Sequence, residues 1–393
     1  LLTSRIDRLA PDDRALLRHL AVLGNEFDQR YVRDVVPVSI RAESGDALLR
    51  LNDFVTVDER GWVIFRHHLV RDVAYEGLPY RTRRQLHSTV AESVRERVGD
   101  QVNEVAPLLS VHYWRARRLR EAWTYSVMAG DQAAAAYANA DAVELYRRAL
   151  SVAAQLRLRD SDVVDTLEKC GDVQRLAGLT EESRRSYIRA RHLALTDPVT
   201  RARMELKTAI LDDRLGRLTS AIRDLRRGER QLAGADSVDV LRLRGQLAGW
   251  EASVRIHQGR LTDAREASRR AIDFAEPVED RATCARAFLT LDYARWALGE
   301  SPDLSDSRRA LDIYTELGDL SGQASALNNL GVVAVAEERF EEAAGYYRRS
   351  RLVREQMGDS SGRALADANL AEVLIEQDDL DTADELLDEA LAV

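Results

Sequence analysis

Apolar residues recur at helical spacing through most of the chain, and the pattern of small and large residues itself repeats. The segments 326–359 and 364–393 align at one constant offset, which places Gly331 opposite Ala371 and Phe340 opposite Leu380. Small residues occupy matching places in both segments, and large apolar residues follow them. Self-similarity at a fixed period predicts paired helices that bury their apolar faces against neighbouring units.

The same spacing can be traced back toward the N-terminus. Each earlier unit is marked by a glycine followed by small and large apolar residues at helical intervals. The marked positions are Gly130, Ala142, Tyr146 and Ala149; Gly171, Ser183, Tyr187 and Ala190; Gly216, Leu218 and Ala221; Gly259, Leu261, Ala264 and Ala271; and a degenerate unit at 287–311. We therefore predict an α–α superhelix with an inner groove over residues 102–393, because an unrelated helical bundle would not explain the repeated spacing.

The first hundred residues follow another pattern. Residues 4–24 predict two helices separated at Pro11, and 28–36 and 42–54 predict two more helical segments. Two runs of β-branched and aromatic residues then flank residues 58–61, which is typical of a β-hairpin.

Helices followed by a small hairpin predict a winged helix over residues 1–80, and a connecting helix at 81–101 then leads into the repeats. The fold class is thus mainly α. A winged helix is common in DNA-binding proteins, and it also serves as a regulatory element in multidomain ATPases.

Composition agrees with a folded, helix-rich protein. Of 393 residues, 45% are apolar and 31% charged, with only 7 prolines and 21 glycines. The apolar runs are too short to cross a membrane, and no signal peptide opens the sequence, so we expect a cytoplasmic protein without membrane contact. Cys170 and Cys284 are far apart among helix-forming residues, which argues against a disulfide framework or a zinc site.

Charge is unevenly distributed. Residues 359–393 contain eleven acidic residues and one basic residue, whereas the whole chain has a net charge of −9, so the rest is nearly balanced. A nucleic-acid-binding domain would show a basic excess, and we do not expect DNA as a partner. The acidic segment favours a basic partner or keeps the last repeat soluble. Because the sequence begins at Leu1 and is helical to its last residue, we expect it to be part of a longer polypeptide.

Two adjacent histidines, His67 and His68, open the amphipathic segment "FRHHLVRDVAY". A metal site is disfavoured, since neighbouring residues rarely direct both rings at one ion and no cysteine or acidic cluster completes the set. An imidazole at a helix start adds a hydrogen-bond donor where an anion is already favoured, and Arg66 and Arg71 add positive charge. From the residues alone, the simpler interpretation is that both histidines cap or pack the helix.

This segment resembles the motif that ends the winged-helix domain of STAND ATPases, where it reads Met-His-Asp-Leu-Val-x-Asp-Leu-Ala. Arg66 stands in the place of the methionine, His67 in that of the histidine, and His68 in that of the first aspartate. The resemblance implies that His67 donates to the β-phosphate of ADP and holds a resting state closed. The replacement of the aspartate by His68 puts the aspartate-dependent part of that contact in question.

The repeats resemble tetratricopeptide repeats, with a small–aromatic–small pattern over 102–393 and a longer period than is usual for that family. Residues 76–94 and the first two dozen residues resemble actinobacterial proteins in which a nucleotide cyclase domain and a STAND-like ATPase precede a repeat array, and also LuxR-type large regulators. The resemblance implies an upstream ATPase and effector domain in the same polypeptide, with ADP or ATP bound there. This chain has no G-x-x-x-x-G-K-[ST] loop, so we expect no enzyme activity and no cofactor from it alone.

Five polar residues are candidates for a partner-binding groove: Asn328, Asn329, Asn369, Gln246 and Glu372. In peptide-binding tetratricopeptide proteins, asparagines on the inner helix hold the peptide main chain, because an amide both donates and accepts hydrogen bonds. The alternative is a structural amide that bonds to a neighbouring helix.

Two further segments combine arginines with aromatic residues. We interpret Arg83 and Arg84 within "YRTRR" (80–84) as a solvated helix face beside Glu92 and Glu96. The aromatic residues of "HYW" (112–114) and "AWTYS" are interpreted as core packing between helices.

These patterns together favour a non-catalytic sensor region of a STAND signalling protein. Its repeats would bind a protein or peptide, and its winged helix would sense the nucleotide state of an upstream ATPase domain. The alternatives are a stand-alone repeat adaptor or scaffold, and a winged-helix transcriptional regulator.

Overall fold

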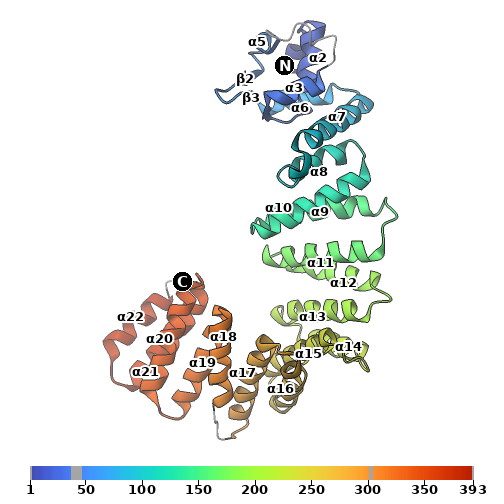
Figure 1. Ribbon diagram of the computed structural model, residues 1–393. Helices are drawn as coiled ribbons and strands as arrows, with labels where there is room; N and C mark the ends of the chain where they lie inside the picture. The colour runs from blue at the N-terminus through green and yellow to red at the C-terminus, as the bar shows by residue number, and fades with distance from the viewer. Residues whose placement is uncertain (1, 37–46, 301–303, 392–393) are drawn as a thin grey trace. The chain divides into compact units, whose positions relative to one another are not determined.

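The structure is a computed structural model that describes residues 2–36, 47–300 and 304–391 (Figure 1). It divides into two compact units, Leu1–Ser186 and Tyr187–Val393. Helices make up most of both units, and the first unit also contains a small sheet.

Short helices and a three-stranded antiparallel sheet open the first unit. The strands lie in the order β1–β3–β2, and the register pairs Phe27 with Val63 and Thr56 with Ile64. The elements are α1 (Leu2–Asp7), α2 (Pro11–Leu20), β1 (Glu26–Asp28), η1 (Gln29–Tyr31), α3 (Val32–Val35), α5 (Ala47–Arg50), β2 (Val55–Val57), β3 (Trp62–Phe65) and α6 (His68–Glu76).

The predicted hairpin at 58–61 is confirmed as the β2–β3 turn, and Pro11 begins the second of the two helices expected in 4–24. The helical segment expected at 28–36 is confirmed as η1 and α3. The segment expected at 42–54 lies partly outside the described residues, and its described part holds α5. Strand β1 was not predicted, because a three-residue strand has no periodicity of its own and depends on its partner β3.

One apolar core joins the sheet and short helices to the helices that follow them. It contains Leu17 of α2, Val63 of β3, Val90 of α7 and Tyr113 of α8, all with side chains at most 1% exposed. The following helices are α7 (Tyr80–Val98), η2 (Gly99–Gln101), α8 (Ala106–Arg115), α9 (Leu119–Ala135), α10 (Asn139–Ala153), α11 (Asp160–Leu176) and α12 (Thr180–Leu193). Because α7 and α8 share this core, they are held rigidly against the N-terminal elements.

The second unit continues as helix pairs. These are α13 (Pro198–Arg214), α14 (Leu218–Gln231), α15 (Val238–His257), α16 (Leu261–Ala275) with η3 (Glu276–Val278), α17 (Arg281–Ala297), α18 (Ser305–Leu317), α19 (Leu320–Ala336), α20 (Phe340–Gln356), α21 (Ser360–Glu376) and α22 (Leu380–Leu391). The step from Leu320 at the start of α19 to Ser360 at the start of α21 equals the step from Phe340 at the start of α20 to Leu380 at the start of α22. This equal spacing confirms the predicted repeat.

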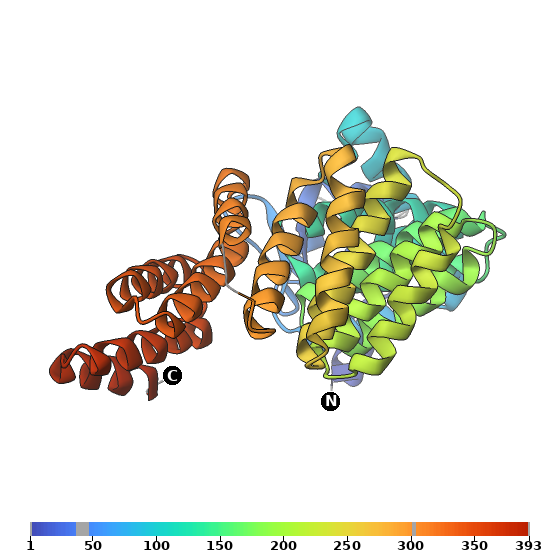
Figure 2. The same cartoon turned by 90° about the horizontal axis from the view of Figure 1, so that it is seen from below.

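Each repeat helix of the second unit packs chiefly on the helices immediately before and after it in the sequence. Helices α19 to α22, coloured orange to red in Figure 2, lie side by side. The turn between the two helices of a pair contains one residue in the left-handed region, for example Gly216 at φ +69° and Gly259 at φ +69°. A glycine adopts this conformation without a steric penalty, which explains the two marker glycines that lie in these turns, Gly216 and Gly259.

The small and aromatic positions of the repeat meet where paired helices cross. Tyr347 of α20 is 3% exposed and its ring lies against Gly331 of α19, and Tyr146 of α10 lies in the same way against Gly130 of α9. A Cβ atom at Gly331 would be 2.5 Å from the Tyr347 ring. The glycine is therefore required by close helix approach.

Replacing Gly331 by alanine is expected to lower the free energy of unfolding by about 1–2 kcal/mol, because the ring must move in a packed core. Gly345, on α20 of the same repeat, offers a matched control, since a Cβ there meets nothing within 4 Å. Gly345→Ala should raise stability by about 0.5–1 kcal/mol through helix propensity alone. Urea unfolding followed by circular dichroism measures both; equal effects of the two substitutions would contradict the packing argument.

A buried carboxylate connects three helices of the second unit. The Glu205 side chain on α13 is 0% exposed and accepts hydrogen bonds from Arg191 of α12 at 2.8 Å and from Arg227 of α14 at 3.2 Å. The two guanidinium groups, 16% and 38% exposed, supply the charge that permits a carboxylate to be buried here.

Candidate functional site

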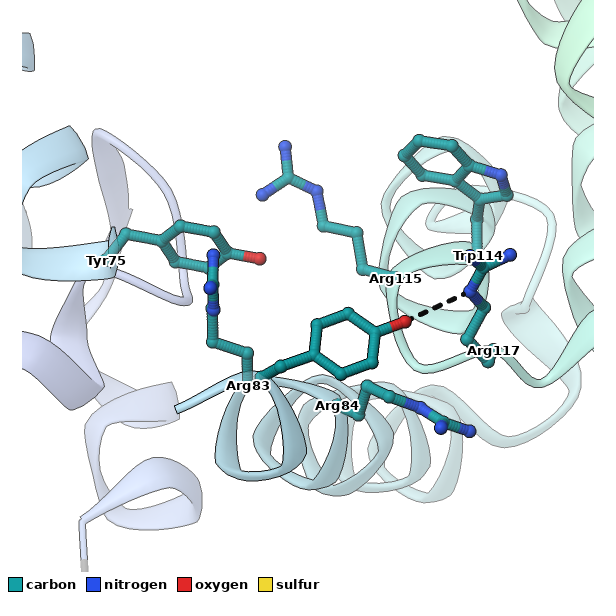
Figure 3. A pocket seen from close by; sticks show the side chains of 7 residues that line it. Tyr75, Arg83, Arg84, Trp114, Arg115 and Arg117 are labelled. Carbon is teal, nitrogen blue, oxygen red and sulfur yellow. Dashed lines mark hydrogen bonds between the residues drawn. The ribbon is translucent and has the colours of Figure 1, made fainter. Parts of the chain in front are cut away.

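A basic pocket of about 340 Å³ lies within the first unit, between α6, α7 and α8 (Figure 3). It is lined by Tyr75, Tyr80, Arg83, Arg84, Trp114, Arg115 and Arg117. The residues come from the end of α6, the first turns of α7, the end of α8 and the turn before α9. Since these helices share the core described above, the pocket has rigid walls.

Tyr75 forms one wall, and arginines surround its ring. The guanidinium carbons of Arg71, Arg83 and Arg115 lie 5.0, 5.1 and 5.3 Å from the ring centre. An aromatic face attracts cations, which holds these like charges near one another. The Tyr75 hydroxyl is fixed from behind by a 2.9 Å hydrogen bond with Nε2 of His87.

Behind Tyr75, two buried histidines contact each other. Nδ1 of His87 lies 3.0 Å from Nδ1 of His112, so one ring donates its N–H to the other. Burial, the neighbouring His112 and the nearby arginines together lower the pKa of His87 to about 2. Burial and Arg115 likewise lower the pKa of His112 to about 4. Both rings are therefore neutral at physiological pH.

The opposite side of the pocket carries the exposed aromatic residues. Tyr80 is 57% exposed and Trp114 is 42% exposed. Arg117 Nε donates to the Tyr80 hydroxyl at 3.3 Å, and this hydrogen bond lowers the pKa of Tyr80. Arg84 donates a long 3.4 Å hydrogen bond to the carbonyl oxygen of Ala116. In Figure 3 the side chain of Arg115 is drawn between the rings of Tyr75 and Trp114.

This arrangement refines two interpretations of the sequence. Arg84 is exposed, as a solvated helix face predicts, and Arg83 is half-buried. Both arginines line the pocket, while Glu92 pairs with Arg118 at 2.6 Å. Among the aromatic residues, Tyr113 is buried and stacks on Tyr125 with ring centres 5.4 Å apart, as core packing predicts. Trp114, however, faces the pocket, because successive residues of a helix point in different directions.

His67 occupies the N-cap of α6, and its Nδ1 accepts a hydrogen bond from the backbone N–H of Leu69 at 3.3 Å. The ring is exposed and stacks on that of His68, with centres 4.7 Å apart. The capping role considered for the histidines is thus present for His67. A contact between His67 and nucleotide stays a prediction.

The two arginines grouped with His67 are engaged by this unit. Arg66 Nε donates to the carbonyl oxygen of Asn52 at 2.5 Å. Arg71 donates to the carbonyl oxygen of Ala21 at 3.0 Å and pairs with Asp72 at 2.8 Å. These bonds tie α6 to α2 and to the sheet, so both side chains have structural partners whatever else they bind.

The predicted groove residues lie on the first helices of their repeats. Asn369 of α21 donates to the side-chain oxygen of Asn328 of α19 at 3.0 Å, which is the structural amide bridge considered as the alternative. Gln246 donates to Asp280 at 3.2 Å. Asn329 is half-buried and Glu372 is exposed. Partner binding by these five residues stays a prediction.

Within the described ranges 2–36, 47–300 and 304–391, no three or more His, Cys, Asp or Glu side chains are grouped to hold a metal ion. None of the helices in those ranges is long and apolar enough to span a membrane.

No protein-family model matches the chain, and no curated protein matches it in sequence. Solved structures do resemble it in fold. A STAND protein with a tetratricopeptide repeat sensor from Pyrococcus horikoshii is 13% identical with a TM-score of 0.50, and the match covers 98% of this chain and 56% of that one. This chain therefore spans little more than half the length of that protein.

Two other solved structures match over most of their own length. Aspartyl phosphate phosphatase F from Bacillus subtilis is 13% identical with a TM-score of 0.55, covering 100% of this chain and 93% of the phosphatase. The Rap conjugation gene regulator of plasmid pLS20, solved in complex with the Phr* peptide, is 14% identical with a TM-score of 0.50, covering 80% and 90%. The chain thus has the fold of tetratricopeptide-like helical repeat proteins.

Proposed function

We propose that this chain is the non-catalytic regulatory region of a STAND-type signalling ATPase. The observation that carries the proposal is the order of its parts: a small antiparallel sheet with short helices, then helical repeats. A STAND protein with a tetratricopeptide repeat sensor matches the fold over 98% of this chain, which supports the proposal. The exposed His67 at the start of α6 gives the N-terminal part a residue suited to sensing.

In this proposal residues 1–80 form a winged helix, 81–101 connect it, and 102–393 bind a partner. Because Nδ1 of His67 accepts from Leu69, the neutral ring carries its proton on Nε2, which can then donate to a phosphate. ADP, held by an upstream ATPase domain in the cytoplasm, is the phosphate carrier. Arg66 and Arg71 hold α6 in place for this contact.

In this proposal the repeats receive the signal that controls the contact between His67 and ADP. A protein or peptide bound on the first helices of the repeats, near Asn329 and Glu372, disfavours the closed packing and allows nucleotide exchange. The ligand acts by its differential affinity for two pre-existing states. The amide bridge between Asn328 and Asn369 keeps two of these helices in register for binding.

Substitutions at His67 in the intact protein test the nucleotide contact. Asparagine is a good N-cap residue but does not place an N–H where imidazole Nε2 lies, so His67→Asn separates capping from sensing. We expect both His67→Asn and His67→Ala to release bound ADP about tenfold faster, as loss of one charge-assisted hydrogen bond predicts, and to raise basal output. Nucleotide retention is measured by stopped-flow release of a fluorescent ADP analogue. If His67→Asn released ADP at the unchanged rate and only His67→Ala released it faster, His67 would act as a helix cap and not as a nucleotide contact.

The gene upstream of the codon for Leu1 provides an independent test. The proposal expects it to encode a phosphate-binding loop within about two domain lengths. A start codon immediately before Leu1 would favour the second candidate, a stand-alone adaptor. That candidate has its own support in the match to aspartyl phosphate phosphatase F, which covers 100% of this chain and 93% of the phosphatase.

A transcriptional regulator is the third candidate. DNA affinity that falls steeply with salt concentration would favour it over the other two.

A further inference from the structure

The basic pocket of the first unit has a charge balance that differs from the rest of the chain. Four arginines line it, at positions 83, 84, 115 and 117, and no carboxylate does. Among the described residues, none of the four forms an ion pair. Arg118, one residue beyond the pocket, pairs with both Glu92 and Glu121. The lack of acidic partners is thus specific to the arginines that line the pocket and does not extend to the neighbouring Arg118.

A second basic hollow, on α14 to α16, shows how arginine clusters are balanced elsewhere. There Arg270 pairs with Glu229 at 3.1 Å and with Glu251 at 2.7 Å, and Arg226 pairs with Glu251 at 3.0 Å. Carboxylates thus neutralise Arg226 and Arg270 of that hollow. The pocket of the first unit leaves its positive charge for a ligand.

Local contacts support this conclusion. The buried Nε of Arg83 has no hydrogen-bond partner among the described residues. Arg83 and Arg115 are instead held against the Tyr75 ring, which restricts them without neutralising them. Like charges at this distance repel, so a bound anion relieves both the repulsion and the unsatisfied donor.

The aromatic lining indicates that the ligand also has a ring. Trp114 presents an exposed indole, and Tyr80 an exposed phenol, beside the four guanidinium groups. Guanidinium forks match phosphate oxygens, and aromatic faces stack on nucleobases. A volume of about 340 Å³ is at the lower end of small-molecule sites, and it suits one nucleotide and not a duplex.

We infer that this pocket binds a nucleotide, with its phosphates on Arg83, Arg115 and Arg117 and its base against Trp114. All the residues that line this site lie in the first unit, and His67 is not among them. The inference does not rest on the proposed role of an upstream ATPase domain.

Isothermal titration calorimetry of the whole chain with ADP, ATP and pyrophosphate, at low salt and without metal ions, tests the inference. We expect ADP and ATP to bind at one site. Arg115→Ala and Arg83→Ala should each weaken both nucleotides and pyrophosphate by about tenfold or more, as loss of a charge-assisted hydrogen bond predicts. Trp114→Ala should weaken nucleotides by about fivefold or more and leave pyrophosphate unchanged.

A control variant separates this site from general charge effects. Arg81→Ala removes an exposed arginine on α7 outside the pocket and should bind ADP as the unchanged chain does. Far-UV circular dichroism and thermal melting check that the variants fold. Trp114 is exposed at the surface, so its variant is expected to fold even if Arg83→Ala does not.

Two results would overturn the inference: no heat of binding at millimolar ADP, or equal ADP affinities in the Arg115→Ala and Arg81→Ala chains. Tighter binding of a single-stranded oligonucleotide than of ATP would overturn it in favour of nucleic acid. Tighter binding of a polyglutamate peptide would overturn it in favour of an acidic protein segment.

Discussion

Replacing Arg191 and Arg227 together by methionine is expected to lower the free energy of unfolding of the second unit by about 3–5 kcal/mol. The double substitution leaves the fully buried Glu205 carboxylate without a cation, while methionine keeps much of the packing volume. A buried charge without a partner costs far more than the pair contributes, because the desolvation penalty is no longer offset. Urea unfolding at neutral pH, followed by circular dichroism, measures the loss.

The triple variant that also changes Glu205 to methionine distinguishes the effect of the unpaired buried charge from the effect of lost arginine packing. It should recover most of the lost stability, since an apolar trio of similar volume is often as stable as a buried ionic one. Arg189→Met, exposed on the same helix α12, is the control and should change stability by less than about 0.5 kcal/mol. If the triple variant were as unstable as the double one, packing of the arginine stems would be the cause.

Acidification is expected to destabilise the first unit before most carboxylates titrate. His87 and His112 have folded-state pKa values of about 2 and about 4, well below the usual 6.5 of an unfolded histidine. The unfolded state therefore binds more protons as pH falls below about 6.5, so the stability present above that pH is lost progressively toward pH 4. From pH 7 to pH 5 the two rings together should remove about 3–4 kcal/mol.

Unfolding by urea at pH 7, 6 and 5 measures the slope of the free energy of unfolding against pH. The variant His87→Gln with His112→Gln cannot take up these protons and should show a much flatter slope, whatever its stability at pH 7. His68→Gln, at an exposed position of the same unit, should keep the full slope. A wild-type slope that equals that of the double variant would show that the buried pair takes up no protons on unfolding.

The sequence predicted the repeats well because their signal is local. Gly331 leaves room for the ring of Tyr347 where two helices cross closely, and Gly130 leaves room for Tyr146 in the same way in an earlier repeat. The hairpin β2–β3 was also predicted from adjacent residues. Strand β1 was missed because its three residues pair with β3, which lies far along the sequence.

The pocket could not be predicted from periodicity, since Tyr75, Arg83 and Trp114 come from three helices brought together only by the fold. A compositional signal was nevertheless present. The stretches 77–91 and 105–120 are rich in arginine and aromatic residues, and neither contains an acidic residue. The absence of carboxylates from α8 and from the first turns of α7 marks the site.

Packing between sequence neighbours also bears on how such an array can change over evolutionary time. Since a helix of the second unit depends mainly on the helix before it and the helix after it, gaining or losing one helix pair leaves every other interface intact. The new pair needs only a small residue and a large one at the crossing, as at Gly331 and Tyr347. The length of the array is therefore free to vary, whereas the sheet and the first helices after it share one core and form a block of fixed size.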